Sequence, residues 1–184
     1  SFFINHAEQL IYLVPDESWR PWRVYVHDVG QDTEDHLIYE EPDNTMWLSA
    51  AMSSDRSSVV ITSSNSEYTE VRLIPTREPK GEPTLLIPKS AGIEYYAEPL
   101  NIAGEQHLLI QHDYNALNSE LVLADMPREG ESLEEYAQRW VPVIRHSEHV
   151  RLEGFTFTAT HLVVTARADT TTRIFLAPRE QLPI

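Results

Sequence analysis

Residues 9–29 read QLIYLVPDESWRPWRVYVHDV, an apolar run, a polar turn and a second apolar run. In the second run, residues 23–27, apolar side chains alternate with charged or polar ones, as they do in a strand that is buried on one face. The first run, residues 9–14, has the length and composition of a strand. The stretch therefore predicts two strands joined by a turn.

The same pattern occurs four times along the chain. The copies are residues 10–14 with 24–29, 59–62 with 71–74, 108–111 with 121–124, and 162–166 with 174–176. Counted from Leu10 to Val59, Leu108 and Leu162, the steps are about 49, 49 and 54 residues, the size of one four-stranded blade of a β-propeller. We therefore expect an all-β fold, a partial β-propeller of about four blades with mostly four antiparallel strands each.

The repeats place the blades at roughly 1–41, 46–88, 92–145 and 149–184, in a single partial propeller over residues 1–184. In the third blade, strands are expected at 93–97, 107–111, 121–124 and 141–144. The fourth blade offers strands at 150–157, 162–166 and 173–176 and then stops, one strand short.

The third blade contains an insertion that predicts a short helix. Ser132 and Glu135 have the spacing of a capping box, and Leu133, Tyr136, Ala137 and Trp140 follow at helical spacing. We expect this apolar stripe to pack on the protein's own sheet rather than to dock another domain.

A blade buries both of its faces against neighbours, so the blades at the ends of a partial array expose apolar surface and strand edges. We expect the chain either to associate with itself through these open edges or to form one part of a larger propeller. Trp47, Tyr95 and Phe155 lie where blades begin, and we expect them to be buried between blades rather than to line a channel.

Composition narrows the class of protein. Of the 184 residues, 41% are hydrophobic, which is enough for a folded core. Asp and Glu number 29 against 14 Lys and Arg, a net charge of -15, so the field of the chain repels phosphate backbones and anionic lipids. Nucleic acids and membranes are therefore not expected as partners. An acidic surface attracts basic peptides, although it also simply keeps a protein in solution.

Cysteine is absent, which excludes disulfides, thiolate metal sites and a cysteine nucleophile. No apolar stretch approaches the ~18 residues that cross a membrane. The start, Ser1-Phe2-Phe3, has neither an initiator Met nor the basic region of a signal peptide. We expect a cytoplasmic protein of which this chain is a part.

The common patterns of enzyme chemistry do not occur in the sequence. The nucleophile motif G-x-S-x-G of α/β-hydrolases, the dinucleotide motif G-x-G-x-x-G and the P-loop are all missing. The six glycines stand at positions 30, 81, 92, 104, 130 and 154 and bracket no serine in the required way. We therefore expect no catalytic residue, no cofactor and no metal in this chain.

The histidines do not suggest a metal site. His146 and His149 are three residues apart, but their segment lies between two predicted strands and no third ligand has a matching spacing. His107 and His112 are separated by an odd number of residues, so they should lie on opposite faces of a strand.

Neighbouring carboxylates could serve acid–base chemistry. In so acidic a chain we interpret them as solvated faces instead. The pairs are Glu40 with Glu41, Asp113 with Glu120, and Glu134 with Glu135.

Residues 12–30, YLVPDESWRPWRVYVHDVG, resemble a segment of the oligopeptidase B group in the prolyl oligopeptidase family of serine peptidases. In that segment an aspartate, an Arg-Pro pair, a strand, a histidine and a glycine follow in this order. Three later stretches resemble the family in the same order along the chain. They are 35–41, an acidic strand end, 66–74, a serine-rich turn with a Glu-Val-Arg-Leu strand, and 150–154, the entry to a later blade.

The resemblance implies that the chain is part of an N-terminal β-propeller domain. In the family, a seven-bladed propeller caps an α/β-hydrolase domain with a Ser-His-Asp triad, admits short peptides and excludes folded proteins, and the oligopeptidase B group cleaves after Arg or Lys. The hydrolase domain is not expected within this chain, so no triad position can be assigned and the chain alone should be inactive. The hydrolase domain of the same polypeptide and short basic peptides are the partners that the resemblance implies.

The repeats alone leave a second hypothesis open, a non-enzymatic propeller that binds a basic protein partner, because a fold does not determine a function. A downstream α/β segment with G-x-S-x-G, then Asp, then His would favour the peptidase. A natural stop near Ile184 would favour the binding module.

Overall fold

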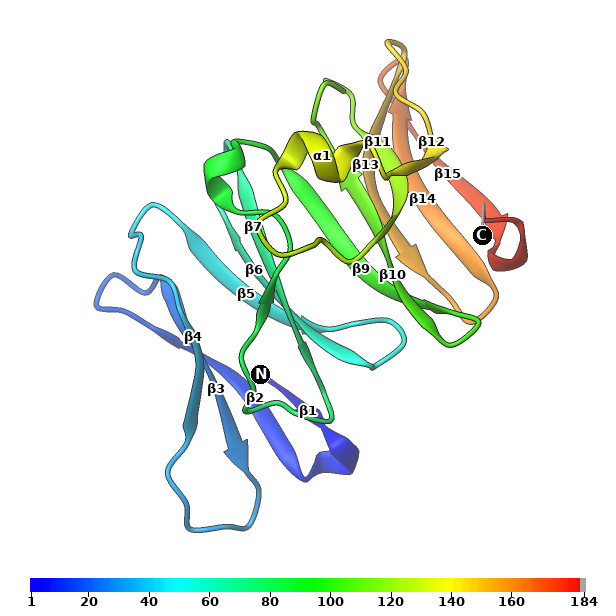
Figure 1. Cartoon of the computed structure of the whole chain (residues 1–184). Helices are drawn as coiled ribbons and strands as arrows, with labels where there is room; N and C mark the ends of the chain where they lie inside the picture. Colours follow the sequence, from blue (N-terminus) through cyan, green and yellow to red (C-terminus); the bar gives the residue numbers. More distant parts are fainter. Residues whose placement is uncertain (183–184) are drawn as a thin grey trace. The chain divides into compact units, whose positions relative to one another are not determined.

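The computed structural model describes residues 1–182 and divides into two compact units, residues 1–90 and residues 91–182, each of which is described by itself (Figure 1). The expected range of the fourth blade, 149–184, ends at residues 183–184, which lie outside the described residues.

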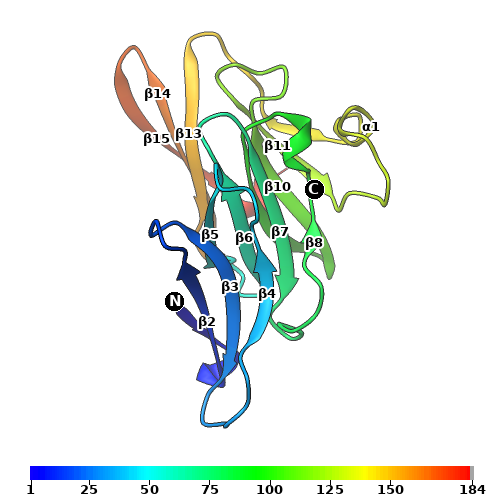
Figure 2. The ribbon, with the colours of Figure 1, turned by 90° about the vertical axis from the view of Figure 1, so that its left-hand side faces the viewer.

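The first unit consists of two four-stranded antiparallel sheets, each a meander in which strands pair in chain order. The first sheet contains β1 (Phe2–Ile4), β2 (Gln9–Pro15), β3 (Pro21–Asp28) and β4 (His36–Glu40). The second contains β5 (Trp47–Met52), β6 (Ser58–Ser64), β7 (Thr69–Pro75) and β8 (Thr84–Leu85). Short 3-10 turns lie at η1 (Asn5–Ala7) and η2 (Lys89–Ala91). In Figure 2 the strands β2, β3 and β4 lie side by side.

The core of the first unit follows from the alternation seen in the sequence. In β3, Val24 and Val26 are buried, whereas Arg23, Tyr25 and His27 are only half-buried on the opposite face. One hydrophobic cluster joins the two sheets and contains Ile4, Ile11, Val24, Val26, Ile38, Leu48, Val59, Ile61 and Ile74. The prediction of a half-buried strand at residues 23–27 is therefore confirmed.

The second unit consists of a four-stranded and a three-stranded antiparallel sheet. The first contains β9 (Tyr95–Ile102), β10 (Glu105–His112), β11 (Glu120–Asp125) and β12 (Val141–Ile144). The second contains β13 (Val150–Phe157), β14 (His161–Ala168) and β15 (Thr171–Pro178), and the 3-10 turn η3 (Arg179–Gln181) follows. Their shared core includes Leu100, Leu109, Leu121, Leu123, Leu152, Phe155, Leu162 and Val164. Across residues 1–182 the all-β expectation is confirmed, and the fourth sheet has three strands as predicted.

The predicted helix is α1 (Leu133–Ala137), and both hydrogen bonds of the capping box between Ser132 and Glu135 are present. Tyr136 is buried and its hydroxyl donates to the carbonyl oxygen of Asp125 at 2.7 Å, so the apolar stripe packs on its own sheet as expected. Trp140 lies beyond the helix. Pro142 soon follows it in β12, and a proline has no N–H with which to continue a helix.

Two strand expectations differ from the structure. Strand β1 was not expected, because three residues are too few to show a periodicity. Strand β9 runs over 95–102 instead of 93–97 and passes through Pro99. A proline is tolerated there because β9 is an edge strand of its sheet. On the open side of an edge strand, no backbone N–H is needed to bond a neighbouring strand.

Candidate functional site

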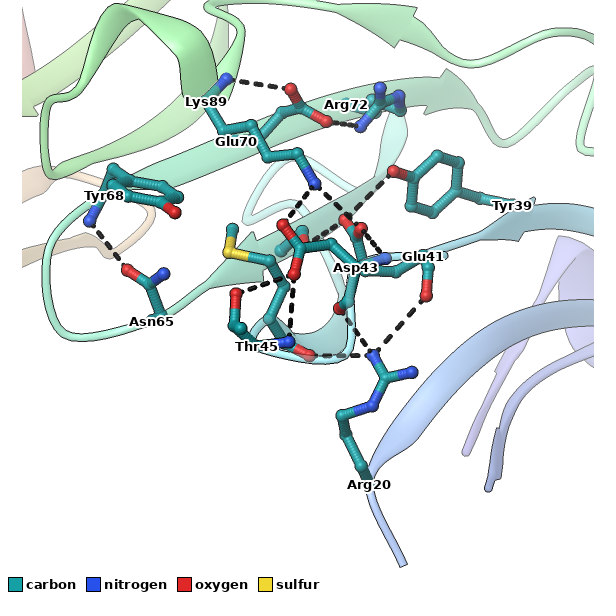
Figure 3. A network of polar contacts seen from close by, with 12 residues as sticks. Arg20, Tyr39, Glu41, Asp43, Thr45, Asn65, Tyr68, Glu70, Arg72 and Lys89 are labelled. Carbon is teal, nitrogen blue, oxygen red and sulfur yellow. Dashed lines mark hydrogen bonds and ion pairs between the residues drawn. The ribbon is translucent and has the colours of Figure 1, made fainter. Parts of the chain in front are cut away.

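A network of charged and polar side chains lies in the first unit, where the chain leaves β4 (Figure 3). Glu41 is fully buried. Its Oε1 accepts hydrogen bonds from Lys89 Nζ at 3.0 Å and from the N–H of Asp43 at 2.9 Å. Its Oε2 accepts from Ser63 Oγ at 2.5 Å and from the Tyr39 hydroxyl at 3.2 Å. Both oxygens of this carboxylate are therefore saturated by donors.

Arg20 anchors the same region from the turn between β2 and β3. Its Nε donates to Asp16 Oδ2 at 2.9 Å. Its Nη1 donates to the carbonyl oxygens of Met46 at 2.9 Å, Asp43 at 3.1 Å and Glu41 at 3.4 Å (Figure 3). Arg20 is buried in doing so, and it ties the hairpin turn to the loop over residues 41–46. Asp16 and Arg20, which belong to the stretch that resembles the family, thus have a structural role.

A second buried carboxylate continues the network. Glu70 pairs with Arg72 and accepts a hydrogen bond from the N–H of Lys89 at 2.9 Å. The guanidinium carbon of Arg72 lies 4.2 Å from the centre of the Tyr39 ring, a cation–π contact. The network therefore connects β4, β7 and the segment at Lys89.

The pKa shifts of Glu41, Asp43 and Lys89 stabilise the charged forms of these side chains. Burial alone would raise the pKa of Glu41, but hydrogen bonds from Ser63 and Lys89 outweigh it and hold the pKa below its usual value. The hydroxyl and N–H of Thr45 lower the pKa of Asp43 to about 2. Burial opposes the charge of Lys89, yet its two carboxylate partners raise its pKa overall. These shifts favour the charged forms of Glu41, Asp43 and Lys89, so we regard the network as a clamp that fixes the fold.

The carboxylate pairs predicted from the sequence do not form acid–base pairs. Glu40 pairs with Arg23 at 2.6 Å, and Asp113 accepts a hydrogen bond from the N–H of Glu94 at 2.9 Å. The interpretation as solvated faces is wrong for Glu41. Its donors Ser63 and Lys89 stand far along the chain, and they make burial of this charge tolerable.

The prediction that His107 and His112 lie on opposite faces of a strand is confirmed. Within residues 1–182, no group of three or more His, Asp or Glu side chains is arranged to hold a metal ion. His107 and His112 lie on opposite faces of β10: the Nδ1 of His107 is 2.9 Å from Asp125 Oδ1, whereas His112 is buried. Among the same residues no helix is long and apolar enough to cross a membrane.

The three aromatic residues at the starts of the blades differ in burial. Tyr95 and Phe155 are buried, as expected. Trp47 is 58% exposed, so the expectation of burial was wrong for it. Its strand, β5, is an edge strand whose residues alternate between the core and solvent, and Trp47 occupies a solvent position next to buried Leu48.

Comparison with known proteins agrees with this architecture. The family model of the prolyl oligopeptidase N-terminal β-propeller domain matches residues 5–182. Protease 2 of Moraxella lacunata is 32% identical over 117 residues, which are 63% of this chain and 16% of that protein. Dipeptidyl aminopeptidase BI of Pseudoxanthomonas mexicana is 28% identical over 167 residues, 90% of this chain and 22% of that protein.

Solved structures of oligopeptidase B are similar to this chain in fold. Oligopeptidase B from Leishmania major superposes with a TM-score of 0.75 at 27% identity, over 95% of this chain and 24% of that one. Oligopeptidase B from Trypanosoma brucei, in a closed form with covalently bound antipain, has a TM-score of 0.76 at 24% identity, over 94% of this chain and 23% of that one. The chain thus spans less than a quarter of each of these relatives. It belongs to the prolyl oligopeptidase family, as part of the N-terminal β-propeller domain.

Proposed function

We propose that this chain is the substrate-gating part of a serine oligopeptidase that hydrolyses short peptides after Arg or Lys. The observation that carries the proposal is the family match over residues 5–182, joined by the similarity to Protease 2. The chemistry would be performed by a C-terminal hydrolase domain of the same polypeptide. The contribution of this chain would be to restrict which peptides reach that domain.

The charge of the chain supports a preference for cationic peptides. A net charge of -15 creates a field that concentrates cations near the surface and speeds their encounter with it. Such a field acts over about 8 Å at physiological ionic strength and further at low salt. The acidic propeller would therefore favour basic peptides before any contact with catalytic residues.

We expect the natural polypeptide that contains this chain to cleave a peptide with Arg or Lys before the scissile bond. The kcat/KM should exceed that of the citrulline analogue about 100-fold, because citrulline keeps the shape of Arg and loses its charge. Peptides of increasing length and a folded protein with an accessible Arg would test the gate. Hydrolysis should stop as the substrate becomes folded.

The electrostatic part has its own measurement. For the Arg peptide, kcat/KM should fall several-fold from low to physiological salt, whereas a neutral peptide should show little change. Equal cleavage of the Arg and citrulline peptides would contradict the specificity. Binding of basic proteins without any hydrolysis would favour the non-enzymatic alternative.

We also expect the isolated 184-residue chain to associate with itself through β15. This strand is an edge of its sheet, and Ile174, Phe175 and Leu176 are 68%, 48% and 66% exposed. The double substitution Ile174→Lys and Leu176→Lys should abolish concentration-dependent association in sedimentation velocity, because charged side chains prevent edge pairing.

The matched control replaces two exposed apolar residues that lie outside strands, Val29→Lys and Leu117→Lys, with the same change of charge. This variant should associate like the wild type. If both double variants were equally monomeric, net charge rather than the β15 edge would govern association.

A further inference from the structure

One face of the sheet β9–β12 carries a hollow of about 380 Å³ near the hairpin that joins β9 and β10. Its lining is partly apolar and partly charged. The apolar residues include Ile102, Leu123 and Val141. The charged residues are Glu105, Asp125 and Arg139.

The strand register explains why these residues meet. Glu105 lies opposite Ile102, His107 lies opposite Asp125, and Leu123 lies opposite Val141. Residues directly opposite each other on neighbouring strands point to the same face of the sheet. Along one strand, every second residue points to that face. Further along the same face, Leu109 and Leu121 belong to the core shared with β13–β15. The hollow therefore lies at the end of the face that packs against β13–β15.

The positive charge of Arg139 is already neutralised. Arg139 makes a two-pronged pair with Glu131, from Nε at 2.9 Å and from Nη2 at 2.7 Å. Its Nη1 lies 3.8 Å from Asp125 Oδ2. The guanidinium carbon of Arg139 also lies 5.2 Å from the centre of the Tyr136 ring, a cation–π contact.

Negative charge remains accessible in the lining of the hollow. The Asp125 side chain is 66% exposed, although His107 Nδ1 lies 2.9 Å from its Oδ1 and Arg139 Nη1 lies 3.8 Å from its Oδ2. The Glu105 carboxylate has no hydrogen-bond or ion-pair partner within residues 1–182, and Glu105 is exposed. Two carboxylates, those of Glu105 and Asp125, thus line the hollow together with the one guanidinium of Arg139, which Glu131 also neutralises. The site is left with a net negative charge.

We propose that this hollow binds the side chain of an arginine or lysine in a peptide. Ile102, Leu123 and Val141 would contact the methylene stem, which such side chains bury readily, and Glu105 with Asp125 would bind the cationic head. The inference goes beyond the proposed function, because it assigns a peptide-binding site to named residues of this chain. It does not require the protein to be a peptidase.

The test uses the full natural polypeptide, treated with an irreversible phosphonylating inhibitor of serine peptidases. N-acetyl-arginine methylamide and its citrulline analogue are titrated into it by calorimetry. Glu105→Gln should weaken binding of the arginine ligand about tenfold, the effect expected for one charged hydrogen bond. Asp125→Asn should weaken it by a similar factor.

The control is Glu94→Gln, which makes the same change of charge at an exposed position of the second unit outside the hollow. It should bind the arginine ligand like the wild type. The citrulline ligand should bind more weakly and should not respond to Glu105→Gln. Equal binding of the two ligands, or equal effects of Glu94→Gln and Glu105→Gln, would overturn the proposal. A separate hydrolysis assay distinguishes this result from a failure of the proposed function.

Discussion

Replacement of Glu41 by alanine should lower the free energy of unfolding of the first unit by about 3 kcal/mol, the low end of the range for breaking a buried ion pair. The low end applies because the Lys89 side chain is 30% exposed and can regain water. Ser63 and the N–H of Asp43 would lose their acceptor as well. Urea unfolding followed by tryptophan fluorescence suits the measurement, since Trp19, Trp22 and Trp47 all lie in this unit.

The neighbouring Glu40 provides the control. Its pair with Arg23 involves side chains that are 37% and 35% exposed, so Glu40→Ala should cost less than about 1 kcal/mol. The double variant Glu41→Ala with Lys89→Met should lose less stability than Glu41→Ala and Lys89→Met lose when their separate losses are added. The reason is that the two side chains interact directly. Equal losses for Glu40→Ala and Glu41→Ala would show that the clamp does not stabilise the fold.

The clamp also has a pH dependence of known sign. The folded pKa of Glu41 is lower than its usual 4.5, so its contribution to stability is present above that value. It is lost as the pH falls through the folded pKa. The loss for Glu41→Ala should therefore shrink in strongly acidic solution.

Much of the fold could be predicted because its signals are local. The alternation at residues 23–27 specifies which face of β3 is buried, and the spacing of Ser132 and Glu135 specifies where α1 begins. The three strands of the fourth sheet follow from three separate apolar runs. In each case neighbouring residues contain the whole pattern.

The polar clamp and the hollow could not be predicted in this way. Glu41 is buried only because Ser63 and Lys89, 22 and 48 residues away, supply its donors. The hollow depends on the register that sets Glu105 opposite Ile102 and His107 opposite Asp125. A shift of one residue would move these side chains to the other face, and the sequence pattern does not determine register at this level.

Acidification should weaken the second unit through His112, which is 3% exposed. Neither of its ring nitrogens has a hydrogen-bond partner within the described residues, and its ring centre lies 4.4 Å from that of Trp140. Burial lowers the pKa of His112 to about 4 from the usual 6.5, with no contribution from a neighbouring charge. The unfolded chain therefore binds this proton more readily than the folded chain does, and stability falls as the pH drops below 6.5.

The expected loss from this one group is about 2 kcal/mol at pH 5 and about 3 kcal/mol at pH 4. His112→Phe keeps a ring against Trp140 and removes the titrating group. Between pH 7 and pH 5, the free energy of unfolding of this variant should therefore fall about 2 kcal/mol less than that of the wild type. Unfolding in urea followed by circular dichroism at both pH values gives the difference. His149→Phe changes an exposed histidine and should follow the wild type. If His112→Phe also followed the wild type, the ring of His112 would be reaching water and protons in the folded state.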